Sequence, residues 1–334
     1  MTKTILIITD NLPEQINGVV TTYKNIEALA VRDNYRVVYL DPGRFRYVDC
    51  PRYNEVKITL TRKRTVGKII KEINPDYIHI ATEGPLGLCA RQYLDKHNYR
   101  YNTAYHTKFP EGIRALFGIP EALTWPLIRW FHKHSGKVLT TTDSMVQELK
   151  EHGFDGDIIS WTRGVDRDIF SPAVGLNKTG QLVLVCVARV SKEKNLEDFF
   201  ELEYAGARKI MVGDGPMLEE YQAQYPNVEF VGFKTGKDLA EYYQMADVFV
   251  FPSKWETFGI VMIEAMACGT PVAAYPVQGP LDVIDEGITG CMNDDLKQAV
   301  KDALMLDRTR VWEGSSRWSW ERAWEIFRNN LLTV

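Results

Sequence analysis

Residues 247–275 read DVFVFPSKWETFGIVMIEAMACGTPVAAY and contain a strand, a loop, a helix and a second strand. The runs 247–251 and 271–275 are short, apolar and rich in aromatic or small residues, as buried strands of a parallel sheet are. Between them lies an apolar helix that Gly269 caps and Pro271 stops. This unit predicts a parallel sheet covered by helices.

The same alternation of strands and helices runs along the chain in two blocks. In the first block, strand-like runs lie at 4–9, 36–40, 76–81, 101–106 and 137–142, with helical patterns near 19–31, 65–73, 86–97, 121–134 and 143–152. In the second block, strand-like runs lie at 182–188, 209–213, 228–232, 247–251 and 271–275, with helical patterns near 194–203, 216–224, 236–245 and 259–268. We therefore predict an α/β protein with two doubly wound domains.

A stretch rich in Gly, Pro and polar residues separates the two blocks and is typical of a linker. We place the first domain at 1–165, the linker at 166–181 and the second domain at 182–318. An amphipathic helix at 319–334 is expected to cross back to the first domain. Two domains of this kind favour a ligand site between them, beyond the carboxyl ends of the strands.

The composition is that of an ordinary globular protein, with 45% hydrophobic and 25% charged residues. Five cysteines without CxxC spacing argue against a zinc site or a disulfide framework: Cys50, Cys89, Cys186, Cys268 and Cys291. The apolar start is too short for a signal peptide, and no run approaches the roughly 18 apolar residues of a membrane span. We expect a cytoplasmic protein that can rest at the inner face of a membrane.

Positive charge is concentrated in the first half of the chain. Residues 1–168 hold 24 Lys and Arg against 20 Asp and Glu, a net charge of +4, whereas the remainder holds 16 against 24, a net charge of −8. Ten basic residues face three acidic ones over 36–71. An ordinary solvated surface explains this bias, and so does an anionic partner, which would be a membrane lipid surface or a nucleic acid.

Three loops that follow strands carry candidate ligand-binding residues. Asn17-Gly18 opens the first helix without the GxGxxG of a dinucleotide site, and is either a plain turn or a phosphate contact. Arg189 and Lys194, five positions apart in ARVSKEKN, suit a diphosphate, although a surface charge cluster would look the same. The turn GDGP (213–216) is a weaker signal of the same kind.

Two glutamates in the opening stretch raise the question of what they bind. Glu256 falls in the loop, Phe258-Gly259 begins the helix, and Glu264 lies about a turn and a half inside it. A buried carboxylate must be paired or hydrogen-bonded, otherwise it takes up a proton. Ribose hydroxyls are suitable donors, and capping or a buried salt bridge is the structural alternative.

The pattern E-x7-E around Phe-Gly, with R-x4-K upstream, resembles the retaining family-four glycosyltransferases of GT-B fold. Three further passages resemble a subgroup that includes glycosyl-diacylglycerol synthases and GDP-mannose-dependent mannosyltransferases: IHIATEGPLGLCAR (78–91), AYHTKFPEGIRA (104–115) and RGVDRDIFSP (163–172). The likeness covers nearly the whole chain. It implies two Rossmann-like domains facing each other across a cleft.

The resemblance also implies roles for the residues that match it. Arg189 and Lys194 would hold the donor diphosphate, Glu264 the ribose, and Glu256 the transferred sugar. The expected catalytic residues are His106, Glu256, Arg189 and Lys194. The expected donor-binding residues are Gly18, Arg189, Lys194, Gly213, Glu256, Thr257, Phe258, Gly259, Ile260 and Glu264. The expected acceptor-side residues are Asn17, Glu83, His106, Lys108 and Arg129.

The expected chemistry is transfer of a hexose or pentose from a UDP- or GDP-sugar, with retention and by a front-face route. A covalent carboxylate intermediate is the other route, but no residue stands out as the nucleophile. No catalytic metal and no cofactor are expected, because Asp166-Arg167-Asp168, which has the DxD form, falls in the linker and suits a turn. No protein partner is evident.

The acceptor is expected at the basic first domain. The segment 114–137 mixes Trp125, Trp130 and Phe131 with Arg129, His132, Lys133 and Lys137, and suits either a membrane interface or a partly buried helix. Basic residues among Phe45, Tyr47 and Tyr53 would suit nucleic acid, so a hydroxymethylated base in phage DNA is a second acceptor class. A nucleotide-sugar epimerase of the same fold, or a non-catalytic binding protein, is the alternative function.

Overall fold

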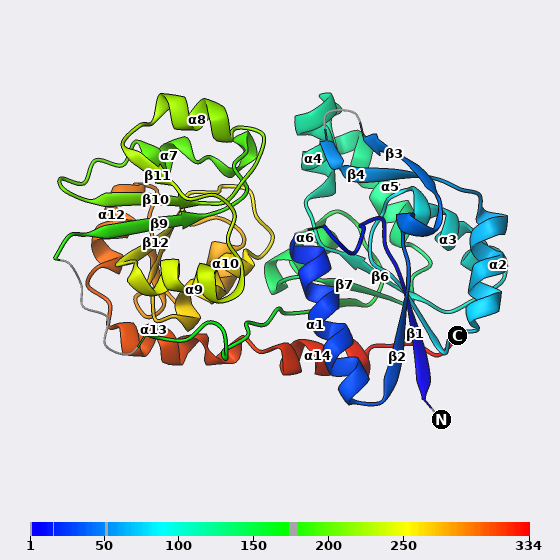
Figure 1. Cartoon of the computed structure of the whole chain (residues 1–334). Helices are drawn as coiled ribbons and strands as arrows, with labels where there is room; N and C mark the ends of the chain where they lie inside the picture. Colours follow the sequence, from blue (N-terminus) through cyan, green and yellow to red (C-terminus); the bar gives the residue numbers. More distant parts are fainter. Residues whose placement is uncertain (1, 16, 51–52, 174–179) are drawn as a thin grey trace. The chain divides into compact units, whose positions relative to one another are not determined.

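The computed structural model describes residues 2–15, 17–50, 53–173 and 180–334. The chain forms two compact units (Figure 1). Unit 1 contains Met1–Arg163 and Trp320–Val334, and unit 2 contains Gly164–Ser319. Each is an α/β unit with a parallel six-stranded sheet between helices, so the predicted fold class is confirmed.

The sheet of unit 1 has the strand order β2-β1-β5-β6-β7-β8. Its strands are β1 (Lys3–Ile8), β2 (Tyr35–Leu40), β5 (Tyr77–Ile80), β6 (Asn102–Tyr105), β7 (Lys137–Thr140) and β8 (Ile158–Ser160). Its helices are α1 (Gly18–Arg32), α2 (Lys63–Ile73), α3 (Pro85–Lys96), α4 (Phe109–Phe117), α5 (Glu121–His132), α6 (Asp143–Glu151) and α14 (Trp320–Asn329). Strand β1, between β2 and β5, is buried on both faces, since Ile5, Leu6, Ile7 and Ile8 are all inaccessible.

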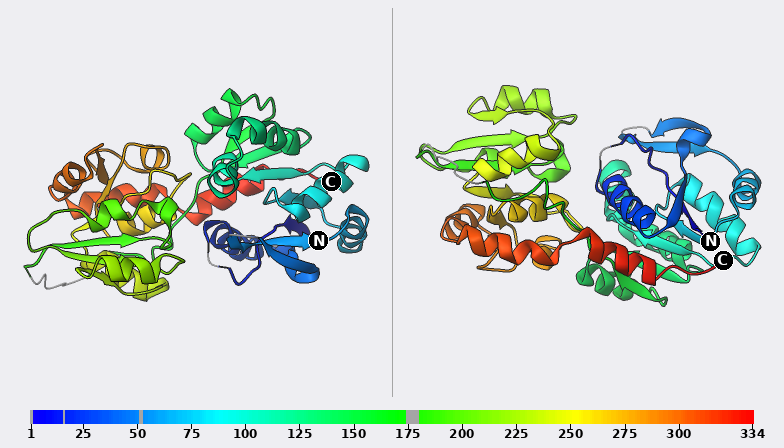
Figure 2. Two further views of the ribbon diagram at one scale, coloured as in Figure 1. Left: turned by 90° about the horizontal axis from the view of Figure 1, so that it is seen from above. Right: turned by 60° about the horizontal axis from the view of Figure 1, so that its bottom comes forward.

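Helix α14 completes the core of unit 1 although it lies far from the rest of the unit in sequence (Figure 2). Phe327 of this helix is fully buried, with its ring centroid 5.0 Å from that of Trp161. The indole Nε1 of Trp161 donates a hydrogen bond to the carbonyl of Ala323 at 2.9 Å. The indole of Trp324 and the guanidinium of Arg328 both donate to Asp33, which follows α1.

The sheet of unit 2 has the strand order β11-β10-β9-β12-β13-β14. Its strands are β9 (Val183–Val187), β10 (Arg208–Val212), β11 (Val228–Phe230), β12 (Val248–Phe251), β13 (Val272–Ala274) and β14 (Gly290–Met292). Its helices are α7 (Glu197–Phe200), α8 (Leu218–Gln224), α9 (Gly236–Met245), α10 (Ile260–Ala267), α11 (Pro280–Val283), α12 (Leu296–Ala303) and α13 (Arg308–Gly314), with short 3-10 helices η2 (Lys192–Lys194) and η3 (Ser315–Arg317). Alternate residues of β9 pack into separate cores on the two faces.

The structure differs from the sequence prediction in three places. The helix predicted over 194–203 is only α7, because Asn195 adopts a left-handed conformation (φ 52°) and separates η2 from it. An antiparallel hairpin, β3 (Arg46–Cys50) and β4 (Tyr53–Leu60), follows the 3-10 helix η1 (Pro42–Arg44) in a segment for which no strand is predicted. Phe170, in the predicted linker, is buried in a core of unit 2, and part of that linker lies outside the described residues.

Candidate functional site

In unit 2, the loops that follow β9, β10 and β12 lie at one edge of the sheet, because the three strands are parallel and adjacent. β9 has β10 on one side and β12 on the other, so the direction of strand progression reverses beside it. Ligands of α/β sheets bind at such a switch point. Most of the predicted donor residues come from these loops, with Arg189 and Lys194 after β9, Gly213 after β10 and Glu256 after β12.

Lys194 and Glu256 form an ion pair between two of these loops. Lys194 Nζ lies 2.9 Å from Glu256 Oε2, and the two side chains are 24% and 22% exposed. Burial by itself would raise the pKa of Glu256, but the Lys194 ammonium and the N–H groups of Thr257 and Phe258 outweigh it and hold that pKa below its ordinary value. The site therefore presents an ionised carboxylate and a partly exposed cation in contact.

Glu264 lies on α10 and is partly buried. Burial raises the pKa of Glu264 to about 7, although the Tyr243 hydroxyl, which donates a hydrogen bond to Oε2 at 3.0 Å, favours the charged form. A carboxylate with a single protein donor retains acceptor capacity for hydroxyl groups. The arrangement is suited to binding a diol such as ribose.

The residue before helix α10 has a left-handed backbone conformation that only glycine adopts easily. Gly259 has φ +82°, and an added Cβ would lie 2.7 Å from Met262 Cε. The preceding Phe258 is buried and packs edge-on against Trp318, and Thr257 is also buried. Among the described residues no side chain caps α10, and Met262 N–H already donates to the carbonyl of Gly259 at 3.0 Å, so the N–H groups of Ile260 and Val261 remain available at this helix start.

Gly213 brings the loop after β10 into contact with the loop that carries Arg189. Its φ is +148°, and a Cβ at this position would lie 1.9 Å from the carbonyl oxygen of Ala188. Val190 N–H donates to the carbonyl of Asp214 at 2.9 Å, and Met217 N–H donates to that of Val190 at 3.0 Å. The role supported for Gly213 is therefore close packing of two loops at the site.

We expect Gly213→Ala to lower the free energy of unfolding by about 2–4 kcal/mol, since the methyl group overlaps a backbone carbonyl in a strained conformation. Urea unfolding of the variant measures this loss. Gly232→Ala is the matched control, because Gly232 also has positive φ but open space around its Cβ position. Gly232→Ala is expected to lower the free energy of unfolding by about 1 kcal/mol, which is the cost of a positive φ without a steric clash. Equal losses in both variants would argue against the steric explanation.

Asp198 joins the same loops, and the sequence analysis missed it. Its Oδ2 accepts hydrogen bonds from Asn195 Nδ2 and Tyr275 Oη, each at 2.5 Å, and from Lys254 Nζ at 3.1 Å. Asn195 also donates to the carbonyl of Pro252 at 3.2 Å. No local pattern identifies this carboxylate, because its partners come from three separate strand ends.

In unit 1, Asp10 follows β1 and caps α3, which follows β5. Its carboxylate accepts from the N–H of Leu86 at 2.8 Å, the N–H of Gly87 at 3.3 Å and the hydroxyl of Thr82 at 2.8 Å. Burial raises the pKa of Asp10 to about 6 despite these donors. Gly84 is required beside it, since a Cβ there would lie 2.3 Å from Asp10 Cγ.

Both ring nitrogens of His106 are engaged within unit 1. Its Nδ1 accepts from the Arg163 guanidinium at 2.8 Å, so Nε2 carries the hydrogen and donates to Tyr23 Oη at 2.9 Å. Tyr23 in turn lies 2.7 Å from His79 Nε2. Burial and the nearby Arg163 charge hold the pKa of His106 well below its ordinary value. The residue is a buried, neutral histidine here, and its contact with a sugar stays a prediction.

The other predicted acceptor-side residues occupy different parts of unit 1. Asn17 caps α1 by accepting from the N–H groups of Val19 and Val20, so these two donors at the helix start are already used. Gly18 is the first residue of α1 and is exposed. Lys108 Nζ lies 3.6 Å from Glu148 Oε2. Arg129 is exposed on α5.

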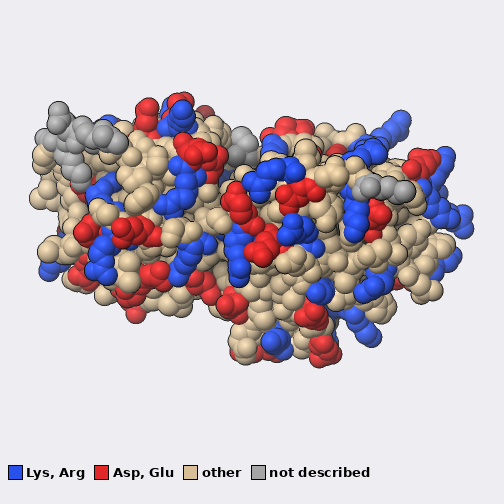
Figure 3. All heavy atoms as spheres, turned by 90° about the horizontal axis from the view of Figure 1, so that it is seen from below, with Lys and Arg blue, Asp and Glu red and all other residues tan. Residues whose placement is uncertain are grey.

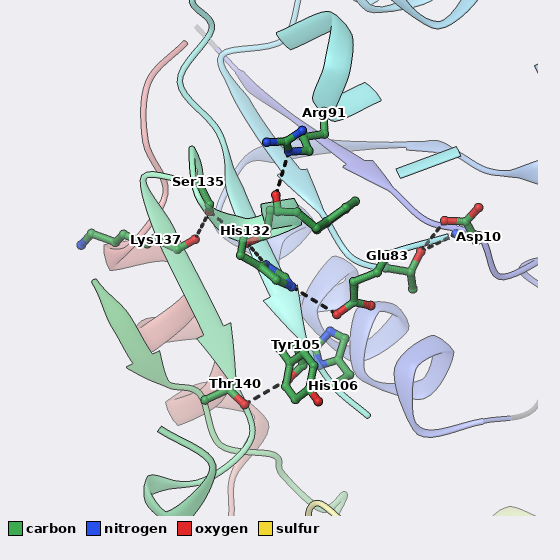
Figure 4. A network of polar contacts seen from close by, with 12 residues as sticks. Asp10, Glu83, Arg91, Tyr105, His106, His132, Ser135, Lys137 and Thr140 are labelled. Atoms are coloured by element: carbon green, nitrogen blue, oxygen red, sulfur yellow. Dashed lines mark hydrogen bonds and ion pairs between the residues drawn. The ribbon is translucent and has the colours of Figure 1, made fainter. Parts of the chain in front are cut away.

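Glu83, the remaining predicted acceptor-side residue, lies with His132 in a network of polar contacts at the edge of the sheet (Figure 4). Glu83 Oε1 is 3.4 Å from His132 Nε2, and the two side chains are 7% and 0% exposed. His132 Nδ1 lies 2.7 Å from Thr103 Oγ1. The structure therefore pairs Glu83 with a histidine that the sequence analysis assigned to a surface.

The segment 114–137 is amphipathic, but its exposed residues differ from those that the sequence analysis selected. Trp125, Phe131 and His132 are buried in unit 1, so they cannot form a contact surface. The exposed apolar side chains of α5 are instead Leu123 (69%), Leu127 (52%) and Trp130 (41%), with Phe117 and Ile119 beside them. The exposed cations nearby in sequence are Arg114, Arg129 and Lys133.

The aromatic side chains that the structure describes in the basic segment 36–71 are partly engaged within the fold. Phe45 is packed against the core of unit 1, and the side chain of Tyr53 lies outside the described residues. Tyr47 is 41% exposed, with the Lys57 ammonium 5.8 Å from its ring, and Lys57 itself pairs with Asp49 at 2.6 Å. On the face drawn in Figure 3, acidic and basic side chains are interspersed over both units.

Asp166 takes part in a turn, as its neighbourhood predicts. Its Oδ1 accepts from the N–H of Asp168 at 3.0 Å, and Arg167 donates to Ser315 Oγ at 3.0 Å. Within residues 2–15, 17–50, 53–173 and 180–334, no group of three His, Cys, Asp or Glu side chains is arranged to hold a metal ion. Metal independence of the reaction stays a prediction.

Each half of the chain matches the model of a known protein family. Residues 18–169 match the model described as glycosyltransferase family 4, and residues 168–306 match that of glycosyl transferases group 1. A GDP-mannose-dependent alpha-mannosyltransferase of Corynebacterium glutamicum is 27% identical, over 95% of this chain and 86% of the relative. An alpha-monoglucosyldiacylglycerol synthase of Streptococcus pneumoniae is 22% identical, over 90% of this chain and 78% of the relative.

Solved structures show the same fold at low sequence identity. Sucrose-phosphate synthase from Thermosynechococcus elongatus superposes with a TM-score of 0.77 at 19% identity, over 98% of both chains. HepE from Anabaena, in complex with UDP and glucose, superposes with a TM-score of 0.70 at 14% identity, over 98% of this chain and 99% of the other.

Proposed function

Because this chain belongs to the family-four glycosyltransferases of GT-B fold, we propose that it is a retaining enzyme that transfers a hexose or pentose from a UDP- or GDP-sugar to a hydroxyl of a membrane lipid. Membership of this family already implies transfer of a sugar from a nucleotide sugar. Retention, the front-face route and the lipid acceptor form the proposal.

The proposed donor site is the edge of unit 2 where Lys194, Glu256 and Glu264 lie. In the reaction, the bond from the anomeric carbon to the diphosphate breaks, a bond to the acceptor oxygen forms, and the acceptor proton moves to the departing diphosphate. Negative charge builds on the diphosphate, so Lys194 and Arg189 would stabilise it. The ionised Glu256 would accept hydrogen bonds from sugar hydroxyls, and Glu264 from the ribose.

The front-face route requires no carboxylate nucleophile. The carboxylate of Glu256 is already bound to Lys194 and to the N–H of Thr257, which lowers its basicity and its nucleophilicity. A group in this state is better suited to orienting a sugar than to attacking it. The leaving diphosphate is then the acceptor of the proton. No metal ion is invoked in this scheme.

The observation that carries the lipid acceptor is the exposed apolar face of α4 and α5. Leu123, Leu127 and Trp130 recur at the spacing of one helix face, and cations flank them. The guanidinium of Arg91 lies 3.9 Å from the centroid of the Trp130 ring. A helix with an apolar face and flanking cations lies in the interface of an anionic bilayer. Alpha-monoglucosyldiacylglycerol synthases among the relatives support the same acceptor class.

Vesicle binding tests this surface. We expect the wild-type chain to sediment with phosphatidylglycerol vesicles, and Leu123→Glu/Leu127→Glu to bind them at least about 10-fold more weakly, since the variant loses two exposed leucines that would insert into the bilayer and gains two anions. Val31→Glu/Met305→Glu is the matched control, because it adds the same two charges at exposed apolar positions elsewhere. Transfer of radiolabelled sugar to a diacylglycerol in the same vesicles should fall in parallel.

Three results would replace this proposal. Wild-type binding to duplex DNA in place of vesicles, with transfer to hydroxymethylated bases, would make DNA the acceptor. Isomerisation of the donor sugar without any acceptor would indicate an epimerase. Equal vesicle binding by the test variant and its control would mean that the exposed face of α4 and α5 does not bind the membrane.

Within the described part of the chain, no helix has the length and apolar character needed to cross a membrane.

A further inference from the structure

Glu83 and His132 form a buried pair that the proposed donor chemistry does not use. Glu83 lies in the loop between β5 and α3, and His132 is the last residue of α5. Glu83 Oε1 and His132 Nε2 are 3.4 Å apart, and neither atom makes a hydrogen bond to any other described residue (Figure 4). Buried groups of this kind need a partner of opposite charge or a ligand.

Glu83 does not act as the cap of α3, although its position next to the helix start suggests that role. Asp10, reaching across from β1, accepts hydrogen bonds from the N–H groups of Leu86 and Gly87. The helix start is therefore neutralised by one carboxylate, and the second is directed toward His132 (Figure 4). Two adjacent carboxylates at one sheet edge thus have separate partners.

The hydrogen bonds beyond His132 determine where its protons lie. The Ser135 hydroxyl donates its only hydrogen to the carbonyl of Lys137 at 2.5 Å. Thr103 must then donate to Ser135 Oγ, at 2.9 Å, and its hydroxyl can only accept from His132 Nδ1, at 2.7 Å. Nδ1 of His132 therefore carries a hydrogen.

This assignment leaves Nε2 of His132 facing the carboxylate of Glu83. Without a proton, a ring lone pair would face a carboxylate oxygen at 3.4 Å in a buried place, which is repulsive. A proton on Nε2 makes the pair an imidazolium and a carboxylate. The position of His132 at the carboxyl end of α5 also favours the cation.

We propose that Glu83 binds the acceptor hydroxyl and that His132 is its positioning residue, which keeps the Glu83 carboxylate ionised inside unit 1. The inference rests on the proposed transferase function. Glu83 lies at the carboxyl edge of the unit 1 sheet, next to the β1–β5 switch point where such sheets bind ligands. A carboxylate paired with a cation is a weak base but a good hydrogen-bond acceptor, so it aims the hydroxyl and leaves its proton to the diphosphate.

Other ionisable groups surround the pair and bear on any pH dependence. They are Asp10 after β1, Tyr23 on α1, Tyr105 and His106 at the end of β6, and Arg91 on α3. Arg91 Nε donates to the carbonyl of Phe131, next to His132, and its NH2 pairs with Asp95 at 3.3 Å. The Tyr105 ring centroid is 6.1 Å from that of His132. His106 is neutral, so it does not supply the counter-charge for Glu83.

The proton assignment is tested by nitrogen NMR of the 15N-histidine-labelled chain without substrate. Both ring nitrogens of His132, identified by comparison with His132→Gln, should carry a proton. His134, which lies 3.1 Å from Asp95 but is 56% exposed, provides an internal reference signal for an imidazole outside the buried pair. A signal from a His132 ring nitrogen without a proton would overturn the ion pair.

The role in acceptor binding is tested by kinetics on whichever hydroxyl compound the wild-type enzyme glycosylates. Glu83→Gln should lower kcat/KM for the acceptor about 10- to 100-fold and leave the donor KM within twofold. His132→Gln should move the acidic limb of the acceptor pH profile to higher pH, whereas His134→Gln should not. Glu83→Gln/His132→Gln should be no slower than Glu83→Gln alone, since His132 acts only through the Glu83 carboxylate, which Glu83→Gln already removes.

The outcomes separate a structural role from a functional one. If His132→Gln lowers thermal stability and activity but leaves the pH profile unchanged, the pair is structural and the inference fails. If the donor KM rises as much as the acceptor KM, Glu83 does not belong to the acceptor side. Absence of transfer to lipid by the wild-type chain would count against the proposed function alone, because the NMR result does not depend on the acceptor.

Discussion

Lys194→Ala is expected to lower kcat about 10²- to 10³-fold, because the variant loses the ammonium group nearest to Glu256 at the proposed diphosphate site. Charge on the diphosphate grows as the bond to the sugar breaks, so a fixed cation there stabilises the transition state more than the bound donor. The rate of nucleoside diphosphate release at saturating donor and acceptor measures the effect. The donor KM should change less than kcat does.

Lys192→Ala provides the matched control for this prediction. Lys192 lies in the same 3-10 helix as Lys194 but is exposed, so its loss should change kcat by less than about twofold. Lys194→Ala also leaves Glu256 without its cation, and Lys194→Ala/Glu256→Gln should regain stability without regaining turnover. Unchanged turnover in Lys194→Ala, or an equal loss in the control, would rule out the diphosphate assignment.

Glu264→Gln is expected to stabilise the protein at alkaline pH and to weaken donor binding at the same time. Burial raises the pKa of Glu264 from 4.5 to about 7, so the folded chain binds more protons than the unfolded chain between these values. Stability therefore falls as pH rises through this window, and the loss is complete above pH 7. Glutamine does not ionise and still accepts the hydrogen bond from Tyr243.

Urea unfolding at two pH values measures the first half of this prediction. Glu264→Gln should raise the free energy of unfolding by about 1–3 kcal/mol at pH 8.5 and by little at pH 5, where the wild-type carboxyl is already protonated in the fold. Glu241→Gln, at an exposed site on α9, should change stability at neither pH. Destabilisation of Glu264→Gln at both pH values would mean that the carboxylate is needed for packing.

Titration with nucleotide sugar measures the second half. Loss of an ionised acceptor for two ribose hydroxyls should weaken donor binding about 10- to 100-fold at pH 8.5. The wild-type affinity should itself rise as pH increases through 7, because the carboxylate form becomes available. An affinity of Glu264→Gln equal to that of the wild type would place the ribose elsewhere.

The sequence predicted the parts of the fold that depend on local pattern. Strands such as 182–188 and 247–251 are continuous apolar runs, and burial on both faces of a parallel sheet requires that composition. The hairpin of β3 and β4 escaped prediction because its residues are of mixed type and most of β3 is exposed, so no hydrophobic periodicity marks it. The short α7 reflects the conformation of one residue, Asn195, which composition does not reveal.

The sequence allowed us to select site residues that lie in one loop with a recognisable motif. It did not reveal which side chains contact one another, because those contacts depend on the tertiary structure. Lys194 and Glu256 were both selected from sequence, but their direct pairing at 2.9 Å depends on the strand order β9-β12. His106 has the residue type of a catalytic base, yet Arg163, 57 positions later, occupies its Nδ1. Asp198 carries no motif, and only the fold brings its three donors together.

The return of residues 320–334 to unit 1 imposes an order on biosynthesis. Unit 2 is a single continuous segment, so all of its residues are available to fold once Ser319 has left the ribosome. Unit 1 begins first but must wait, because Trp161 is covered by Phe327 and Asn102 Nδ2 donates to the carbonyl of Asn330. Unit 2 can therefore reach its final state before unit 1, which keeps an open apolar surface until residues 320–334 have been made.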